Sequence, residues 1–385
     1  MSEMSRRKFL ETGSKGIALA SIPFIFGANP LAAIMAPGGG GLKDYYEHFG
    51  VNESIINQVM GTALEKGGDF CDLYFQHKIS NSIGLEDNIV SRASTDVALG
   101  VGIRVVREDQ TGYSFTEEIS LKAMKEAAQT AANIANANKS FNPVELKHHQ
   151  TPSYYNVNTR WEDVGIDTKI PMLQQINDKM ASIDKRVIKT QVYFGDSNDY
   201  MMVATSDGRV AYDYRPQTRV FAVCNAEENG RRENNYDMLG GRMGIEYYTP
   251  ESLENLAIST VKKTVDLFEA VKPEAGEMEV VLAAGDAGIL LHEAIGHGME
   301  ADFNRRGESL FADKIGKKVA EDFVSIVDDG TLPNYRGSLN VDDEGNDTEV
   351  TYLVEKGILK TYLHDKISAK HYDVKPTGNG RRESF

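Results

Sequence analysis

The chain has 385 residues, of which 41% are hydrophobic, and it carries a formal net charge of −15. This length is enough for two or three domains. The negative charge repels phosphate backbones and therefore disfavours nucleic-acid partners. The basic pairs Arg231–Arg232 and Arg381–Arg382 are short, and we expect them to lie in solvated turns. Cys71 and Cys224 are too few for a disulfide framework or a cysteine-based zinc knuckle. We expect two unrelated buried thiols, although an oxidising compartment would allow them to pair.

The N-terminal residues 1–36 have the layout of a secretory signal. Arg6–Arg7 lie in a basic start, which an apolar stretch and small residues follow. The adjacent arginines resemble the twin-arginine type of signal, which exports folded proteins. We therefore expect a periplasmic protein, with a cytoplasmic location as the alternative. Pro23 and Gly27 interrupt the apolar stretch, which argues against a stable membrane span. Residues 36–41, "APGGGG", are expected to form a flexible linker.

Two stretches, 42–145 and 160–272, share one order of elements. In each stretch, apolar residues at helical spacing come first, strand-like runs follow, and a second helical pattern ends the stretch. The predicted helices cover about 52–66, 119–135, 170–184 and 250–268. The turns at Asp87–Asn88 and Asp207–Gly208 occupy corresponding places. We infer an internal duplication of an α+β unit.

The region 277–385 has a different character. The run "MEVVLAA" (278–284) predicts a buried strand, and Gly285–Asp286 offers a turn and a helix cap. A helix with the sequence "LLHEAIGHGMEAD" then runs to about Asp302, and mostly strands follow it. The predicted fold class is α+β: a duplicated helix–antiparallel strands–helix region, followed by a mostly β C-terminal domain that carries this helix.

The helix holds two histidines, His292 and His297, with Glu293 beside the first. On a regular helix, with about 100° per residue, residues five apart point roughly 140° apart and cannot share a tetrahedral metal. A π-bulge at or just before Gly296 would bring the rings together, and such bulges are frequent at functional sites. Glu300 would then turn toward the face of His292 as a ligand or as an orienting group. From the residues alone, a metal site and a helix with two ordinary histidines are equally supported.

Several longer runs carry a resemblance to a known family. They are "LLHEAIGHGMEADFNRRGESLF", "VDDGTLPNYRGSLNVDDEGN", "EKGILKTYLHDK" and "TGNGRRESF". Together they resemble the TldD branch of the TldD/PmbA metalloproteases, in layout from about Asn52 to Phe385 and most strongly after Glu277. The resemblance implies a zinc peptidase that cleaves unfolded peptides, with His292 and His297 as metal ligands and Glu293 as the general base.

The resemblance also implies partners and a third ligand. Family members form homodimers or heterodimers with a PmbA-like sister subunit, and they take a third zinc ligand, a cysteine, from a segment beyond the equivalent of Phe385. No match to that segment is present, so we expect the chain to be C-terminally truncated, unless Glu300 or water completes the site. The alternative function is that of a non-catalytic assembly or regulatory subunit. The residues that follow the helix, Asn304–Arg306, either face the site or cap the helix.

Overall fold

The computed structural model describes residues 42–135, 141–285 and 287–385 in two compact units, Met1–Asn52 and Glu53–Phe385. The expected signal and linker lie outside the described residues, and so does Asp286. In the first unit, α3 (Leu42–His48) is described, and the ring of Tyr45 lies 5.6 Å from the ring of Tyr46. Among the described residues, no helix has the length and apolar character needed to cross a membrane.

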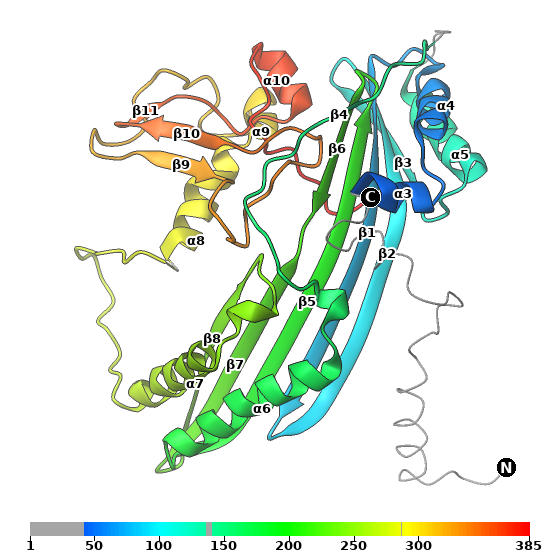
Figure 1. The fold of residues 1–385 in the computed structure, drawn as a ribbon. Coiled ribbons are helices and arrows are strands. Elements are labelled where there is room, and N and C mark those ends of the chain that lie inside the picture. Colours follow the sequence, from blue (N-terminus) through cyan, green and yellow to red (C-terminus); the bar gives the residue numbers. More distant parts are fainter. Residues whose placement is uncertain (1–41, 136–140, 286) are drawn as a thin grey trace, which may run out of the picture. The chain divides into compact units, whose positions relative to one another are not determined.

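An eight-stranded sheet forms the largest part of the second unit (Figure 1). Its strands are β1 (Phe70–Glu86), β2 (Ile89–Arg107), β3 (Gln110–Thr116), β4 (Lys147–His148), β5 (Val187–Thr205), β6 (Arg209–Tyr214), β7 (Gln217–Glu228) and β8 (Arg231–Gly241). The predicted turns at Asp87–Asn88 and Asp207–Gly208 connect β1 to β2 and β5 to β6. β1 pairs with β5 antiparallel, from Asp72 opposite Thr205 to Glu86 opposite Gln191. This pairing joins the strands of both expected α+β stretches in one sheet.

Four helices cover parts of this sheet, and their apolar faces explain their positions. They are α4 (Glu53–Leu64), α5 (Leu121–Ala131), α6 (Ile166–Ile183) and α7 (Pro250–Val265). α4 and α5 pack near β1–β3, whereas α6 and α7 lie beside each other over β5, β7 and β8 (Figure 1). The side chains of Ser120 and Thr249 cap α5 and α7 by accepting backbone hydrogen bonds. Helix, strands and helix occur twice, and the predicted α+β class is confirmed.

The core beneath α6 and α7 is apolar and well buried. Trp161, Leu173, Phe194 and Val261 belong to it, and each is at most 2% exposed. Short 3₁₀ helices connect the elements around this sheet, at Ala132–Ile134, Trp161–Asp163, Ile245–Tyr247 and Asp266–Phe268. Removal of such large apolar side chains from water is the main favourable contribution to folding.

The C-terminal segment has its own small core. Its elements are α8 (Ala287–Leu291), a π-helical turn (His292–Gly296), a 3₁₀ turn (His297–Met299), α9 (Ala301–Arg305), β9 (Ile326–Asp329), β10 (Val350–Glu355), β11 (Ile358–Leu359) and α10 (Lys366–Tyr372). The three strands form a separate sheet in the order β11-β10-β9. Met299, Leu353 and Tyr362 are buried together beside this sheet.

The predicted strand 278–284 is wrong. This segment has no strand in the structure, and Met278, Val280 and Val281 are 56%, 69% and 96% exposed. No strand among the described residues pairs with it, and an apolar run alone cannot specify a pairing partner. The structure also contains β8, which was not predicted from the sequence because "RRENNYDMLGG" is mostly polar. Its alternating exposed residues fit a strand at the edge of the sheet.

The pair Arg381–Arg382 was expected in a solvated turn, and for Arg382 this is wrong. Arg382 is mostly buried, and its Nη2 donates to Asp72 Oδ1 at 2.6 Å. Arg104 binds the other oxygen of this carboxylate, with its Nε 2.9 Å away. Because a buried charge requires a partner of opposite sign, the Asp72 carboxylate explains why Arg382 lies inside the fold. Arg231–Arg232, by contrast, are exposed at the start of β8.

A second ion pair lies at the same junction between the sheet and the C-terminal segment. Arg215 Nη1 donates to Asp343 Oδ1 at 2.5 Å and its Nε to Asp213 Oδ2 at 2.9 Å. Arg381 Nε donates to Asp343 Oδ2 at 2.8 Å. We call the five residues Asp72, Arg104, Arg382, Arg215 and Asp343 the ionic junction. Its members come from β1, β2, the end of β6 and the C-terminal segment, so the junction ties that segment to the large sheet.

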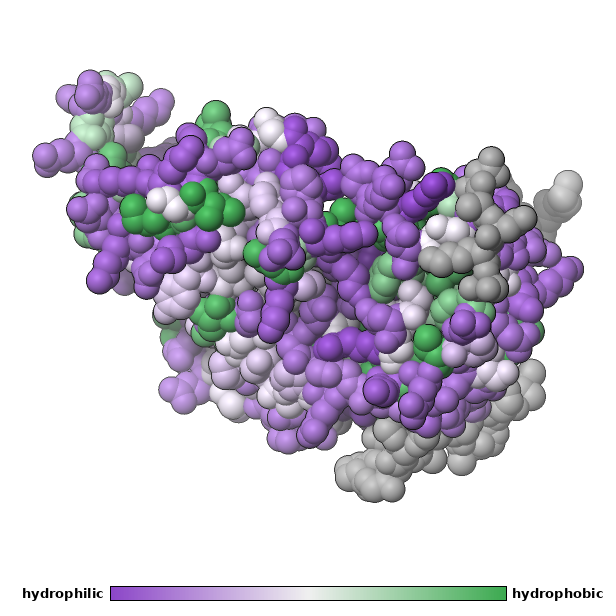
Figure 2. All heavy atoms as spheres, turned by 90° about the horizontal axis from the view of Figure 1, so that it is seen from above, coloured by the Kyte–Doolittle hydropathy of each residue, from purple (hydrophilic) through white to green (hydrophobic). Residues whose placement is uncertain are grey.

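Both cysteines are buried and unpaired, as the sequence analysis expected. Burial, and to a lesser extent the charge of Asp72, raises the pKa of the Cys71 thiol. On the face shown in Figure 2, hydrophilic residues predominate and hydrophobic residues form separate patches.

Candidate metal centre

The two histidines lie on a helix that widens between them. The backbone N–H of His297 donates to the carbonyl of His292, five residues earlier, which is the hydrogen bond of a π-helix. The bulge predicted from the spacing of His292 and His297 is therefore present. Gly296 has the ordinary helical angles φ −55° and ψ −55°, so the widened turn does not depend on a left-handed glycine.

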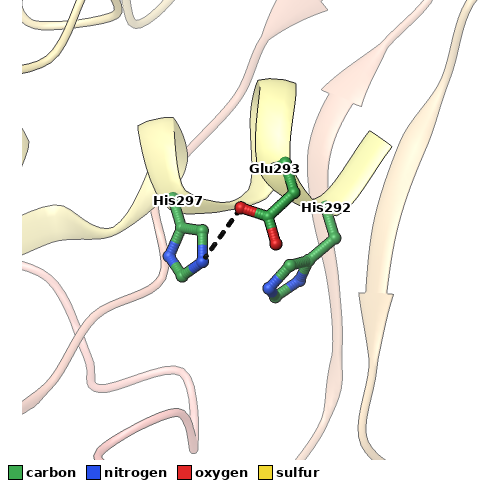
Figure 3. A group of neighbouring side chains, drawn as sticks. All are labelled: His292, Glu293 and His297. Carbon is green, nitrogen blue, oxygen red and sulfur yellow. Dashed lines mark ion pairs between the residues drawn. The ribbon is translucent and has the colours of Figure 1, made fainter. Parts of the chain in front are cut away.

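The widened turn places both imidazole rings on one side of the helix. Their centroids are 4.6 Å apart, and their planes are inclined at 69°. Figure 3 shows the carboxylate of Glu293 beside the two rings. One donor atom from each of His292, Glu293 and His297 lies within 4.8 Å of the others. Convergence of the histidines is thus confirmed, whereas the roles of the three residues stay predictions.

Glu300 orients His297. Its Oε1 lies 2.6 Å from Nδ1 of His297, and this hydrogen bond raises the pKa of the imidazole. With Nδ1 engaged, Nε2 is the atom available for a metal, and it lies 3.8 Å from Oε2 of Glu293. A carboxylate that holds the far nitrogen of a histidine is the usual outer partner of a metal-binding imidazole. Of the two roles expected for Glu300, the geometry favours the orienting one.

The donor set fits a divalent metal such as zinc. Two neutral imidazoles with a neighbouring carboxylate are typical zinc donors, and catalytic zinc sites keep a coordination position open. The side chains of Glu293 and His297 are 64% and 52% exposed, so water reaches the site. Glu293 can serve either as a third donor or as a base beside the metal.

The residues after the helix do not point toward the histidines. Asn304 donates from Nδ2 to the carbonyls of Gly298 and Glu300, at 2.8 Å each. Arg305 approaches Asp109 at 3.6 Å, and Arg306 pairs with Asp302 at 3.2 Å. Asn304 therefore fixes the turn after His297, and both arginines bind elsewhere.

A cavity of about 460 Å³ lies next to Glu300, and it was not predicted from the sequence. Arg381, Asn379 and Gly380 of the "TGNGRR" run line it, together with Asp302 and Asp365. Only the position of this run within a family motif could have signalled such a role, because its distance from the histidines in the sequence is large.

Comparisons with known proteins agree on one family. The domains described as PmbA/TldA metallopeptidase domain 1, central domain and C-terminal domain match residues 71–135, 159–268 and 275–385. The metalloprotease TldD homolog of Buchnera aphidicola is 38% identical over 87% of this chain and 73% of its own length. This chain belongs to the TldD/PmbA metallopeptidase family.

Two further proteins are similar to the chain at lower identity. The zinc metalloprotease TldD homolog of Saccharolobus solfataricus is 26% identical over 84% of this chain and 71% of its own length. The crystal structure of TldE from Thermococcus kodakarensis superposes with a TM-score of 0.63 at 18% identity, over 89% of this chain and 74% of that one. This last likeness concerns the fold.

Proposed function

We propose that the chain is a zinc-dependent metallopeptidase that hydrolyses unfolded peptides, with His292 and His297 as metal ligands and Glu293 as general base. The observation that carries this proposal is the π-helical turn, because it makes two histidines five residues apart converge beside a carboxylate. Membership in a metallopeptidase family and a relative named as a zinc metalloprotease support the choice of reaction and of metal.

Each side chain has a distinct role in this proposal. His292 and His297 hold the metal through their ring nitrogens, and Glu300 fixes the tautomer of His297 through Nδ1. The zinc ion, when bound, supplies a Lewis acid that polarises the scissile carbonyl and makes water acidic. Glu293 accepts a proton from the attacking water and passes it to the amine that leaves. Its exposed carboxylate is free to reach both.

Replacement of Glu293 by Gln tests the base separately from the metal. We expect hydrolysis of an unfolded peptide to fall roughly 10²–10⁴-fold, because glutamine cannot accept the proton. Zinc content, measured by mass spectrometry after reconstitution at neutral pH, should stay near one per chain. His297→Ala should lose both metal and hydrolysis.

The same measurements can refute the proposal. Full hydrolysis by Glu293→Gln would remove Glu293 from the mechanism. A wild-type chain that binds no zinc after reconstitution would instead favour a non-catalytic subunit that works through assembly.

We further propose that the chain assembles as a dimer, either with a second copy or with a TldE-like sister subunit. The support is the similarity in fold to TldE. Light scattering on the purified chain, alone and after coexpression with such a subunit, distinguishes the two assemblies from a monomer.

For localisation we propose export by the twin-arginine route to the periplasm, based on Arg6–Arg7 and the apolar stretch that follows. Replacement of Arg6–Arg7 by Lys–Lys should leave the protein in the cytoplasmic fraction. A wild-type protein found only in that fraction would contradict export.

A further inference from the structure

A polar cavity of about 110 Å³ lies against the ionic junction, apart from the histidines. Five cationic side chains line it, but only two acidic ones, Asp199 and Glu383. The cations are Lys78, Arg215, Arg242, Arg381 and Arg382. The volume suffices for a few waters or for a carboxyl group. In a chain with a net charge of −15, such a concentration of positive charge is unusual.

Arg242 has no carboxylate partner among the described residues. It is only 7% exposed, yet its guanidinium donates only to two carbonyls, those of Ser338 and Pro216. Its Cζ also lies 5.1 Å from the centre of the Tyr155 ring. A guanidinium has five N–H donors and stays charged in proteins, so at least half of its donor capacity is unused. Burial, together with the charge of nearby Arg215, lowers its pKa.

Lys78 is half-exposed and lies opposite Asp199 in the pairing of β1 with β5, and both residues line the cavity. The other three arginines are paired: Arg215 and Arg381 with Asp343, and Arg382 with Asp72. Asp72 and Asp343 of the ionic junction bind these three arginines, and Asp199 lies opposite Lys78. Arg242 is thus the buried cation of this cavity that has no carboxylate partner among the described residues. A buried charge without a counter-ion is costly, so the cavity is built to receive an anion.

This cavity and the larger cavity beside Glu300 share one lining residue. Arg381 lines both this cavity and the larger one beside Glu300, whose carboxylate binds His297. A peptide that occupied the larger cavity would contact Arg381 there. We propose that Arg242 and Lys78, with Arg381 at the entrance, bind a carboxylate of the peptide substrate, either its free C-terminus or an acidic side chain. This inference rests on the proposed peptidase function, because it names the substrate class of that site.

Two pairs of fluorescein-labelled peptides test the inference. The first pair has no acidic residue and ends in a carboxylate or in an amide. The second pair is amidated and contains one Glu or one Gln. Affinities are measured by fluorescence anisotropy on zinc-reconstituted Glu293→Gln protein, and kcat/KM is measured on the wild type. We expect the carboxylate member of at least one pair to bind about 10-fold tighter or more, as charge-assisted hydrogen bonds imply.

Lys78→Gln is the informative variant, because Lys78 is half-exposed and holds no ion pair that folding needs. It should reduce the preference for the carboxylate several-fold, and Arg381→Gln should do the same. Lys185→Gln and Arg92→Gln are matched controls, since both residues are exposed and lie outside the cavity. These controls should keep the preference. For the buried Arg242 the conservative Arg242→Lys is used, with circular dichroism as a check of folding.

The outcomes separate this inference from the proposed function. If only the first pair shows tighter binding of the carboxylate member, the site binds the C-terminus. If only the second pair does, the site binds an acidic side chain. Either result supports the site. Equal affinities and equal rates within both pairs overturn the carboxylate site, even if the protein hydrolyses peptides. A preference in binding that Lys78→Gln removes, without hydrolysis of any peptide, supports the site and refutes the peptidase. If the variants of Lys78, Arg381 and Arg242 all keep the preference for the carboxylate peptide, as both controls do, the assignment to this cavity is also overturned.

Discussion

Charged side chains occupy two contrasting environments in this protein. At the ionic junction, the side chains of Asp72 and Asp343 are 0% and 1% exposed, and arginines bind both carboxylates. On the histidine helix, Glu293 and His297 are 64% and 52% exposed, and π-helical geometry brings His292 and His297 together. The ionic junction buries its charges against partners of opposite sign, whereas the histidine helix leaves its donor atoms accessible to a metal ion from the solvent.

This contrast indicates that residues important for stability and residues important for chemistry lie in separate regions of the fold. Removal of one partner from a buried ion pair leaves an uncompensated charge and is strongly destabilising. Exposed pairs contribute little to stability. We therefore expect substitutions at the junction to affect folding and those at the histidine helix to affect metal binding and turnover.

The largest effect on stability is expected for Asp343→Ala. This change removes the acceptor of Arg215 and Arg381 and should lower the free energy of unfolding by about 3–5 kcal/mol. Chemical denaturation measures it. Asp322→Ala is the control, because Asp322 is 83% exposed and pairs with Lys318 at 2.8 Å; it should cost less than about 1 kcal/mol. Equal losses of unfolding free energy in Asp343→Ala and Asp322→Ala would contradict the contrast between buried and exposed ion pairs.

The dependence of stability on pH should reveal Asp342, which lies beside the junction. Burial, with the charge of Glu344, raises the pKa of Asp342 from its usual 3.8 to about 6. The folded state then binds the proton more tightly, so this stabilisation is complete below about pH 4 and is lost as the pH rises through 6. The loss is roughly 3 kcal/mol by the size of the shift. Denaturation at pH 3.5 and 7 measures it, and in Asp342→Asn this contribution should disappear.

Asp343 should act in the opposite direction at lower pH. Burial alone would raise its pKa, but Arg215 and Arg381 outweigh burial and lower that pKa to about 2. The stabilisation by ionised Asp343 is therefore present above pH 3.8, the usual pKa of an aspartate, and is lost as the pH falls toward 2. A stability that continued to rise below pH 3 would contradict the assignment.

A smaller effect is expected for Glu300→Gln at the histidine helix. Loss of the carboxylate that holds Nδ1 of His297 should weaken zinc binding about 10–100-fold. Competition with a chromogenic zinc chelator measures the affinity. Glu308→Gln removes an exposed carboxylate that pairs with Arg306 and should leave the affinity unchanged.

The smallest effect is expected for His292→Ala on the stability of the metal-free protein. No residue of α8 or of the π-helical turn is buried, so the free energy of unfolding should change by less than about 0.5 kcal/mol. Met299→Ala, seven residues later and fully buried, should cost about 2–5 kcal/mol. A large loss in His292→Ala would show that the helix is part of the core.

Local patterns in the sequence predicted much of the fold. Apolar spacing indicated the helices α4–α7, and the turns at Asp87–Asn88 and Asp207–Gly208 indicated where hairpins reverse. The spacing of His292 and His297 predicted the π-helical turn, because the geometry of a helix permits few ways for them to meet. These features depend on residues close in sequence.

Features that depend on distant residues were not predictable. Arg382 looked like a solvated residue, because its partner Asp72 lies on β1 and has no pattern in common with it. The run at 278–284 was expected to be a strand, although pairing requires another strand that local sequence does not reveal. The cavity around Arg242 likewise forms from β1, β5, the start of β7, Arg242 itself and the C-terminal residues, which only the folded chain brings together.

The pairing of Asp72 with Arg382 has a consequence for the order of folding during synthesis. The two residues are 310 positions apart, whereas Arg104 follows Asp72 by only 32. At a ribosomal rate of about 5–20 residues per second, Arg382 emerges roughly 15–60 s after Asp72. During that interval Arg104 is the partner within reach on the growing chain. The hairpin of β1 and β2 can thus form early, while Arg104 is the arginine that binds the Asp72 carboxylate. Arg382 binds the other carboxylate oxygen once it has left the ribosome.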